Sequence, residues 1–299
     1  MPKLIIAGSV NMDIVAFTKH IPVKGETVLG SSLKYFPGGK GGNQAVAAAR
    51  MGAETHFIGC VGDDAFAETL TTYLAGAGVE THIRQVSGVS SGTALIIVAD
   101  NDNVITVVPG ANLSVGSEDL TIDIQSGDIL LSQFEIGFDA LEEFFRKGKA
   151  AGATTILNPS PYAEIPAQLR KLTDILIVNE GELMAIAGVS GSDAAFARIA
   201  KEILTKDNYK AVIVTLGASG VMMVTEQDVK HIQAEKVEVV DTTGAGDCFA
   251  GAFASSLCGQ ATLEEAVRLA SRAAAISVTR EGASTSSPTL EEVTSRFGA

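Results

Sequence analysis

The sequence predicts an α/β fold built on a mainly parallel central sheet. Short apolar or β-branched runs alternate with stretches of helical periodicity through most of the 299 residues, as expected when helices connect and cover neighbouring strands. The runs are continuously apolar, which is typical of strands buried on both faces. The strands expected on these grounds cover residues 4–7, 55–59, 129–132, 155–157, 175–178 and 211–216.

The segments between these strands have helical spacing. The clearest is 263–278, where apolar residues recur at intervals of three and four. Thr262 and Glu265 occupy the positions of a capping box at its start. The expected helices cover residues 43–51, 66–74, 140–151, 194–205 and 263–278.

Two regions do not fit this alternation and predict a small antiparallel β lid. Residues approximately 10–40 are extended and rich in turns. Residues 92–108 predict a hairpin, with strands 93–99 and 104–108 around the turn 100–103. An edge extension of the main sheet is the alternative. Because no repeat or linker divides the chain, we expect a single domain, 1–299, that carries this lid.

Composition and charge limit the classes of ligand. The chain has 22 Lys and Arg against 35 Asp and Glu, a formal net charge of −13. This charge disfavours nucleic acids and anionic membranes as partners, and the apolar run before Gly8 is too short for a signal or a membrane span. We expect a soluble cytoplasmic protein that holds any phosphate locally, through backbone N–H groups, a few cations and a metal ion.

The cysteines and histidines show no metal motif. The three cysteines have no CxxC spacing, which indicates reduced thiols, and Cys248 is expected to be a packed residue rather than a nucleophile. The four histidines lack HxxxH or HExxH spacing, so ordinary surface or packing roles are expected for them. The histidines are His20, His56, His82 and His231.

The strongest chemical signal is the segment VVDTTGAGDCFAG at residues 239–251. A β-rich stretch, 236–240, leads through a turn of small residues into an apolar helix, 248–257. Helix N-termini expose unpaired N–H groups and the positive end of the helix dipole. The amides that would face an anion in this turn belong to Gly244, Ala245 and Gly246.

Asp247 follows this turn directly. An aspartate there can simply cap the helix. Beside an anion-binding turn, it can also accept the proton of a hydroxyl held in line with a phosphate, which is the base role in phosphoryl transfer.

The loop GGKGGN at 38–43 is not a Walker A sequence, because Gly41 follows Lys40 and position 34 is a lysine. Its glycines allow the backbone to approach a ligand closely. Lys40 can donate hydrogen bonds, and Asn43 can both donate and accept them, so these two side chains suit a polyhydroxyl substrate. A flexible turn is the alternative. Asn11 and Asp13 follow the first strand, where α/β sheets bind ligands, or form an Asx turn.

Two further strand ends carry candidate residues. Asn179 and Glu182 follow strand 175–178 and, taken alone, are typical of an acidic helix N-terminus. The segment 215–220, TLGASG, is a turn of small residues that could simply connect two strands.

The run DTTGAGDCFAGAF resembles the C-terminal signature of the ribokinase family of carbohydrate kinases, and PGGKGGNQAVAAARMGA resembles its N-terminal signature. Both occur in the family's order, and the resemblance extends from GSVNMD to VTREGAST. It implies a ribokinase-like three-layer sandwich and ATP-dependent phosphorylation of D-ribose at O5, giving D-ribose 5-phosphate and ADP. Alternative acceptors in the family are 2-deoxyribose, a ketohexose or a nucleoside. It also implies a homodimer joined through the lid sheet.

The resemblance assigns roles residue by residue. Asp247 is the implied base, assisted by Gly244, Ala245 and Gly246. The implied sugar contacts are Asn11, Asp13, Gly39, Lys40, Asn43, Glu135 and Asp247. The implied ATP contacts are Asn179, Thr215, Gly217, Ser219, Gly220 and Gly246. Mg²⁺ is implied at Asn179 and Glu182, largely through water. A monovalent cation, K⁺, is implied at Asp241, Thr243, Ser277, Arg280, Gly282 and Ser286.

Two other classes of function remain possible at this stage. A sugar-binding protein without activity would keep the fold but has no need of Asp247 and the anion-binding turn. A dinucleotide-dependent oxidoreductase fits the α/β pattern, but no GxGxxG turn follows the first strand.

Overall fold

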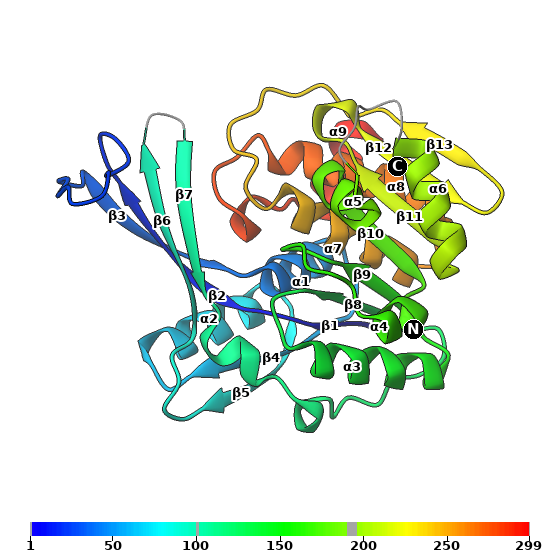
Figure 1. Ribbon diagram of the computed structural model, residues 1–299, viewed down its shortest axis with the longest axis horizontal. Helices are drawn as coiled ribbons and strands as arrows, with labels where there is room; N and C mark the ends of the chain where they lie inside the picture. Colours follow the sequence, from blue (N-terminus) through cyan, green and yellow to red (C-terminus); the bar gives the residue numbers. More distant parts are fainter. Residues whose placement is uncertain (1, 100–101, 190–195, 299) are drawn as a thin grey trace.

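The computed structural model describes residues 2–99, 102–189 and 196–298 (Figure 1). Its main sheet has nine strands in the order β13-β12-β11-β10-β9-β8-β1-β4-β5. The strands are β1 (Leu4–Ala7), β4 (Thr55–Gly62), β5 (Glu80–Val86), β8 (Ile129–Gln133), β9 (Thr154–Asn158), β10 (Ile175–Asn179), β11 (Ala211–Thr215), β12 (Val221–Thr225) and β13 (Val229–Ile232). All neighbours from β5 to β11 pair in parallel, whereas β12 and β13 are antiparallel additions.

Helices cover both faces of this sheet and give the expected three layers. Along β1, Leu4 and Ile6 contact one apolar cluster, whereas Ile5 and Ala7 contact the other. The first layer contains α1 (Lys40–Arg50), α2 (Ala65–Gly76), α7 (Ala245–Cys258), α8 (Leu263–Ser277) and α9 (Leu290–Phe297). The second contains α3 (Phe138–Ala151), α4 (Ala167–Leu172), α5 (Glu180–Ala187) and α6 (Phe196–Asp207). No helix of the described residues is long and apolar enough to cross a membrane.

A second, four-stranded sheet rises away from the main sheet at the left of Figure 1. Its order is β3 (Ser32–Gly38), β2 (Asn11–Phe17), β6 (Gly92–Ala99) and β7 (Asp102–Val108). The outer pairs β2/β3 and β6/β7 are antiparallel, as predicted, but the central pair β2/β6 is parallel. Of the predicted turn 100–103, Asp102 and Asn103 belong to β7, and residues 100 and 101 lie outside the described residues.

Several expected boundaries are wrong for physical reasons. Residues 236–240 form no strand; Val239 and Val240 are each 59% exposed, and β-branched composition alone does not supply a pairing partner. Helix α7 begins at Ala245, so Asp247 lies within its first turn. Strand β5 was not expected because its sequence ETHIRQV is polar, as an edge strand permits.

The other expected helices are present, with boundaries shifted by a few residues. The capping box of α8 is confirmed, because Thr262 accepts from the Glu265 N–H and Glu265 accepts from the Thr262 N–H. Of the expected helix 194–205, residues 194 and 195 lie outside the described residues.

Helices α1 and α7 pack in close contact because α7 has a glycine where they meet. A Cβ on Gly251 would overlap the carbonyl oxygen of Gln44 and the side chain of Ala47. This close approach allows residues at the start of α1 to reach the first turn of α7.

We expect Gly251→Ala to destabilise the protein by about 1–3 kcal/mol, because the added methyl group must push α1 away from α7. Urea unfolding measures this change. Gly76→Ala is the matched control: Gly76 also lies in a helix, but nothing lies within 4 Å of the added Cβ. That control should be neutral or stabilising by up to about 1 kcal/mol. Equal midpoints for the two variants would contradict the packing argument.

Candidate active site

Polar residues gather where five neighbouring parallel strands end. These adjacent parallel strands are β11, β10, β9, β8 and β1. Their carboxyl ends therefore lie together along the C-terminal edge of the sheet, the edge formed by the strand ends. The small sheet begins at the same edge, since β2 follows β1 closely. The polar residues at these strand ends are Asn11, Glu135, Asn158, Asn179 and Thr215.

Asp247 is held at this edge by two amide side chains from α1. It is buried, with 7% exposure. Its Oδ2 accepts a hydrogen bond from Asn43 Nδ2 at 2.9 Å, and its Oδ1 accepts one from Gln44 Nε2 at 3.1 Å. These two hydrogen bonds hold the carboxylate in a fixed orientation.

A buried amide network supports Gln44 in turn. Gln133 Nε2 donates to Gln44 Oε1 at 2.6 Å, and Gln44 Nε2 also lies 3.2 Å from Asn158 Oδ1. Asn158 Nδ2 donates to the carbonyl oxygen of Ile177 at 3.0 Å. Sequence reasoning missed Gln44, Gln133 and Asn158. Gln133 and Asn158 are the last residues of β8 and β9, so they could have been found as polar groups at strand ends.

Two acceptors in this network have no partner. Among the described residues, Asn43 Oδ1 and Gln133 Oε1 are buried without a hydrogen bond. Such groups are rare in folded proteins because burial removes their hydration. A ligand hydroxyl that donates to Asn43 would satisfy it.

Three carboxylates surround the Lys40 side chain. Burial alone would lower the pKa of Lys40, but the negative charges of Asp247, Glu135 and Glu182 outweigh it and raise that pKa. Glu135 Oε2 also accepts from the Lys40 backbone N–H at 3.0 Å and from the Ser9 hydroxyl. Lys40 is therefore a fully protonated cation inside an acidic pocket.

Asp13 titrates near neutrality. Burial raises the pKa of its carboxyl group to about 7, with further contributions from the nearby charges of Glu135 and Asp247. The side chain contacts the backbone of Gly38, where a Cβ would overlap the carboxylate. Asp13 thus changes charge in the physiological range.

The glycine loop passes directly over the start of β2. Gly39 has φ +84°, and a Cβ there would lie 2.8 Å from Asn11 N. Asn11 is 3% exposed, and its Oδ1 accepts from Asn112 Nδ2 at 2.7 Å. All the residues implied as sugar contacts therefore lie at or beside this edge.

The first turn of α7 offers free backbone donors, with one correction. Gly244 is the N-cap, with φ +73° and no side-chain cap. Among the described residues, the N–H groups of Gly244, Gly246 and Asp247 have no partner. Ala245 N, however, donates to Thr242 O at 3.2 Å and closes the turn. The prediction that the Ala245 amide faces an anion is therefore wrong, and the Asp247 amide takes its place in the available set.

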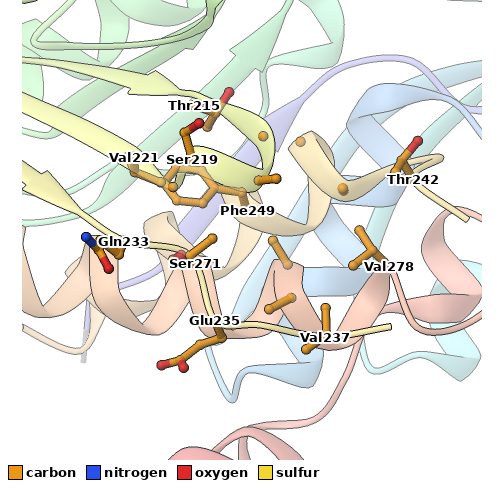
Figure 2. A pocket seen from close by; sticks show the side chains of 18 of the residues that line it. Thr215, Ser219, Val221, Gln233, Glu235, Val237, Thr242, Phe249, Ser271 and Val278 are labelled. Carbon is orange, nitrogen blue, oxygen red and sulfur yellow. The ribbon is translucent and has the colours of Figure 1, made fainter. Parts of the chain in front are cut away.

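Two adjoining cavities reach this turn. The larger, of about 960 Å³, is lined by all six residues implied as ATP contacts, Asn179, Thr215, Gly217, Ser219, Gly220 and Gly246. Figure 2 shows side chains that line it, among them Thr215, Ser219, Val221 and Phe249. The smaller, of about 220 Å³, is lined by Lys40, Asn158, Glu182 and Asp247, and it shares Asn179, Thr215, Thr242, Ala245 and Gly246 with the larger.

Asn179 and Glu182 form a complete capping box at the start of α5. Asn179 Oδ1 accepts from the Glu182 N–H at 2.8 Å, and Glu182 Oε2 accepts from the Asn179 N–H at 2.9 Å. The helix-capping interpretation is therefore correct. It leaves the second carboxylate oxygen of Glu182, a residue 7% exposed, beside the smaller cavity.

The residues implied for a monovalent cation lie in two adjoining segments, one just before α7 and one that runs from the last residue of α8 to residue 286. Asp241 Oδ1 accepts from Thr243 N and Oγ1 at 2.9 and 2.6 Å, and Asp241 Oδ2 accepts from Gly282 N at 2.9 Å. Burial would raise the pKa of Asp241, but these bonds outweigh it and lower that pKa. The Arg280 guanidinium is instead 2.6 Å from Glu292.

The remaining polar groups here are locally satisfied. The hydroxyls of Ser277 and Ser286 donate to Ala274 O and Ala283 O at 2.8 and 2.7 Å.

Burial raises the pKa of the Cys248 thiol to about 11. Cys248, 1% exposed, is the packed residue that the sequence predicts.

Comparisons with known proteins agree with this geometry. The chain matches the family described as pfkB family carbohydrate kinase over residues 1–290. It is 36% identical over 294 residues to the ribokinase of Haemophilus influenzae, covering 97% of this chain and 96% of that protein. It is 33% identical over 293 residues to the deoxyribokinase of Salmonella typhi, covering 96% of each.

Solved structures show the same fold. The ribokinase of Thermotoga maritima superposes with a TM-score of 0.90 at 35% identity, covering 100% of both chains. Arabidopsis thaliana ribokinase complexed with ribose and ATP superposes with a TM-score of 0.91 at 31% identity, covering 98% of both. The ribokinase-like sandwich expected from the sequence is confirmed, and the chain belongs to the pfkB family of carbohydrate kinases.

Proposed function

We propose that this protein transfers the γ-phosphoryl group of ATP to O5 of D-ribose. The observation that carries the proposal is the position of Asp247: a buried carboxylate that is fixed by two amides, lies beside free helix N–H groups and lines the smaller of two adjoining cavities. The relatives named ribokinase, and the Arabidopsis ribokinase complexed with ribose and ATP, support the same substrates.

The two substrates lie on either side of the first turn of α7. ATP lies in the larger cavity, along the segment from Thr215 to Gly220, with its phosphates directed toward this turn. The smaller cavity, lined by Lys40 and Asp247, leads from the phosphates to the sugar, which is covered by the four-stranded sheet as a lid that excludes water. The proposed sugar contacts are Asn11, Asp13, Gly39, Lys40, Asn43, Glu135 and Asp247.

Asp247 accepts the proton of the primary hydroxyl as its oxygen attacks the γ-phosphorus atom. The amides of Gly244, Gly246 and Asp247 stabilise negative charge on the phosphoryl oxygens. Lys40 adds a full positive charge in the same cavity.

The residues present fit the proposed ions. Glu182 offers a buried carboxylate oxygen beside Asn179, a donor type that Mg²⁺ prefers, and these two residues would hold it largely through water. When bound, Mg²⁺ supplies charge neutralisation at the phosphates. Asp241 fits K⁺, since its low pKa keeps the carboxylate charged. Thr243, Ser277, Arg280, Gly282 and Ser286 would add hydroxyl or main-chain oxygens. The three free, buried cysteines suit the cytoplasm that we propose as its location.

The first test is ATP- and Mg²⁺-dependent ADP release with D-ribose, measured in a coupled assay. We expect Asp247→Asn to lower kcat by about 100- to 10,000-fold, because the base is lost, while sugar binding by calorimetry changes little. Near-normal turnover in this variant would refute the assignment.

Asp139→Asn is the control, because Asp139 also lies in the first turn of a helix but is exposed. It should retain full activity. The deoxyribokinase relatives make 2-deoxyribose the competing acceptor, and a higher kcat/KM for 2-deoxyribose than for D-ribose would assign the protein to that substrate instead.

Sugar binding should depend on pH through Asp13. With its pKa raised to about 7, Asp13 is protonated below this pH in the free protein and charged above it. Sugar hydroxyls that donate to the carboxylate require the charged form. We therefore expect the dissociation constant to rise below pH 7, by up to about tenfold per unit.

Calorimetric titrations between pH 6 and 8 test this expectation. Asp13→Asn should bind the sugar more weakly, with a dissociation constant that no longer changes over this range. An unchanged pH slope in the variant would exclude Asp13 as the titrating group.

We also propose that two copies join through the small sheet. Its strands expose apolar side chains to an extent that favours a partner. The exposed side chains are Leu33, Tyr35, Leu95, Val104, Ile105, Val107 and Val108.

We expect the wild-type protein to sediment as a dimer and Ile105→Lys to shift it toward monomer, because a charge must then be buried at the interface. Val229→Lys is the matched control on β13, an edge strand of the main sheet, since Val229 is 44% exposed and Ile105 51%. A monomeric wild type, or equal shifts in both variants, would contradict the proposal.

A further inference from the structure

Three potential metal ligands meet at the amino ends of β4 and β5. These strand ends lie at the N-terminal edge of the main sheet, opposite the C-terminal edge that carries the kinase site. His56 and Glu80 are paired in the parallel register of these strands. His82 follows Glu80 by two residues, so both side chains lie on the same face of β5. The strand register therefore places these three side chains on one face.

Their ligand atoms converge on one point. His56 Nδ1 lies 3.2 Å from His82 Nε2 and 3.6 Å from Glu80 Oε1, and His82 Nε2 lies 3.4 Å from Glu80 Oε1. Three ligands on one face of a tetrahedron around Zn²⁺, with bonds of about 2.0–2.1 Å, lie about 3.3 Å apart. The observed separations match this spacing.

Hydrogen bonds alone explain this cluster less well than a metal ion does. A proton bridges only two atoms at a time, so one proton cannot hold His56 Nδ1, His82 Nε2 and Glu80 Oε1 together. A cation placed between them attracts all three lone pairs at once.

A further carboxylate orients His56. Glu54 Oε1 lies 3.4 Å from His56 Nε2. Metal-binding histidines generally donate their second ring N–H to a carboxylate, which fixes the tautomer. With the proton on Nε2, His56 presents the Nδ1 lone pair to the point where the three ligands converge.

Charge and access suit a metal cation. Glu54 and Glu80 provide two negative charges against the one positive charge of Lys3. The side chain of His56 is 6% exposed, but those of His82 and Glu80 are 28% and 64% exposed, so an ion can enter from solvent.

We propose that His56, Glu80 and His82 bind one Zn²⁺ ion, with water as the fourth ligand, and that the ion holds edge strand β5 to β4. Two imidazoles and a carboxylate form a ligand set that favours Zn²⁺ over Mg²⁺. The expectation of ordinary roles for these histidines is replaced by this proposal.

Calorimetric titration of untagged, chelator-treated protein with ZnCl₂ tests it, with CoCl₂ absorption spectra to report tetrahedral coordination. We expect one Zn²⁺ per chain, with affinity at least about tenfold lower in His82→Gln. Excess Zn²⁺ should raise the Tm of the wild type by mass action and raise that of the variant less.

His20→Gln is the matched control, because His20 lies 2.8 Å from a single carboxylate, Glu26, and should leave binding unchanged. Glu80→Gln changes an exposed side chain, so it tests the site without risk to folding, and it should also weaken binding. Equal Zn²⁺ affinity in the wild type, His82→Gln and Glu80→Gln would overturn the proposal, as would an equal loss in His20→Gln.

Discussion

The contact between the N-termini of α1 and α7 determines the geometry of the kinase site. Asn43 and Gln44 donate to both oxygens of Asp247, which is possible because Gly251 lets the two helices approach closely. The same start of α1 carries Lys40, so one helix positions both the proposed base, Asp247, and the neighbouring cation. The glycine loop before α1 lies against Asn11 and Asp13, which connects this geometry to the small sheet.

A protein of net charge −13 can hold a nucleotide because the attractive groups are local. Free N–H groups at α7 and the Lys40 ammonium act at short range, where little water screens them. Burial, with smaller contributions from the charges of Glu135 and Asp247, raises the pKa of Asp13 to about 7. The negative charges of Asp247, Glu135 and Glu182 also raise the pKa of Lys40 despite its burial.

The sequence predicts the parallel strands well, because runs such as LIIA are buried on both faces and allow few other structures. It also predicts the strand-end positions of Asn11, Asn179 and Thr215. The sequence does not predict strand formation where this depends on a neighbouring strand. Residues 236–240 are rich in β-branched side chains but pair with no strand, whereas the polar segment β5 is a strand because it pairs with β4. The Ala245 N–H donates to the Thr242 carbonyl oxygen in a local turn, which the composition of the segment does not predict.

The two edges of the main sheet differ in electrostatic character because its helices run opposite to its parallel strands. Helix N-termini gather with the carboxyl ends of the strands, where their positive dipole ends favour anions such as phosphates. Helix C-termini gather at the other edge: α1 ends at Arg50 shortly before β4, and α2 ends at Gly76 shortly before β5. Their negative dipole ends add to Glu54 and Glu80 and favour a cation beside His56 and His82. The fold itself therefore separates the proposed phosphate site from the proposed cation site, although His56 and His82 lie too far apart in the sequence to form a motif.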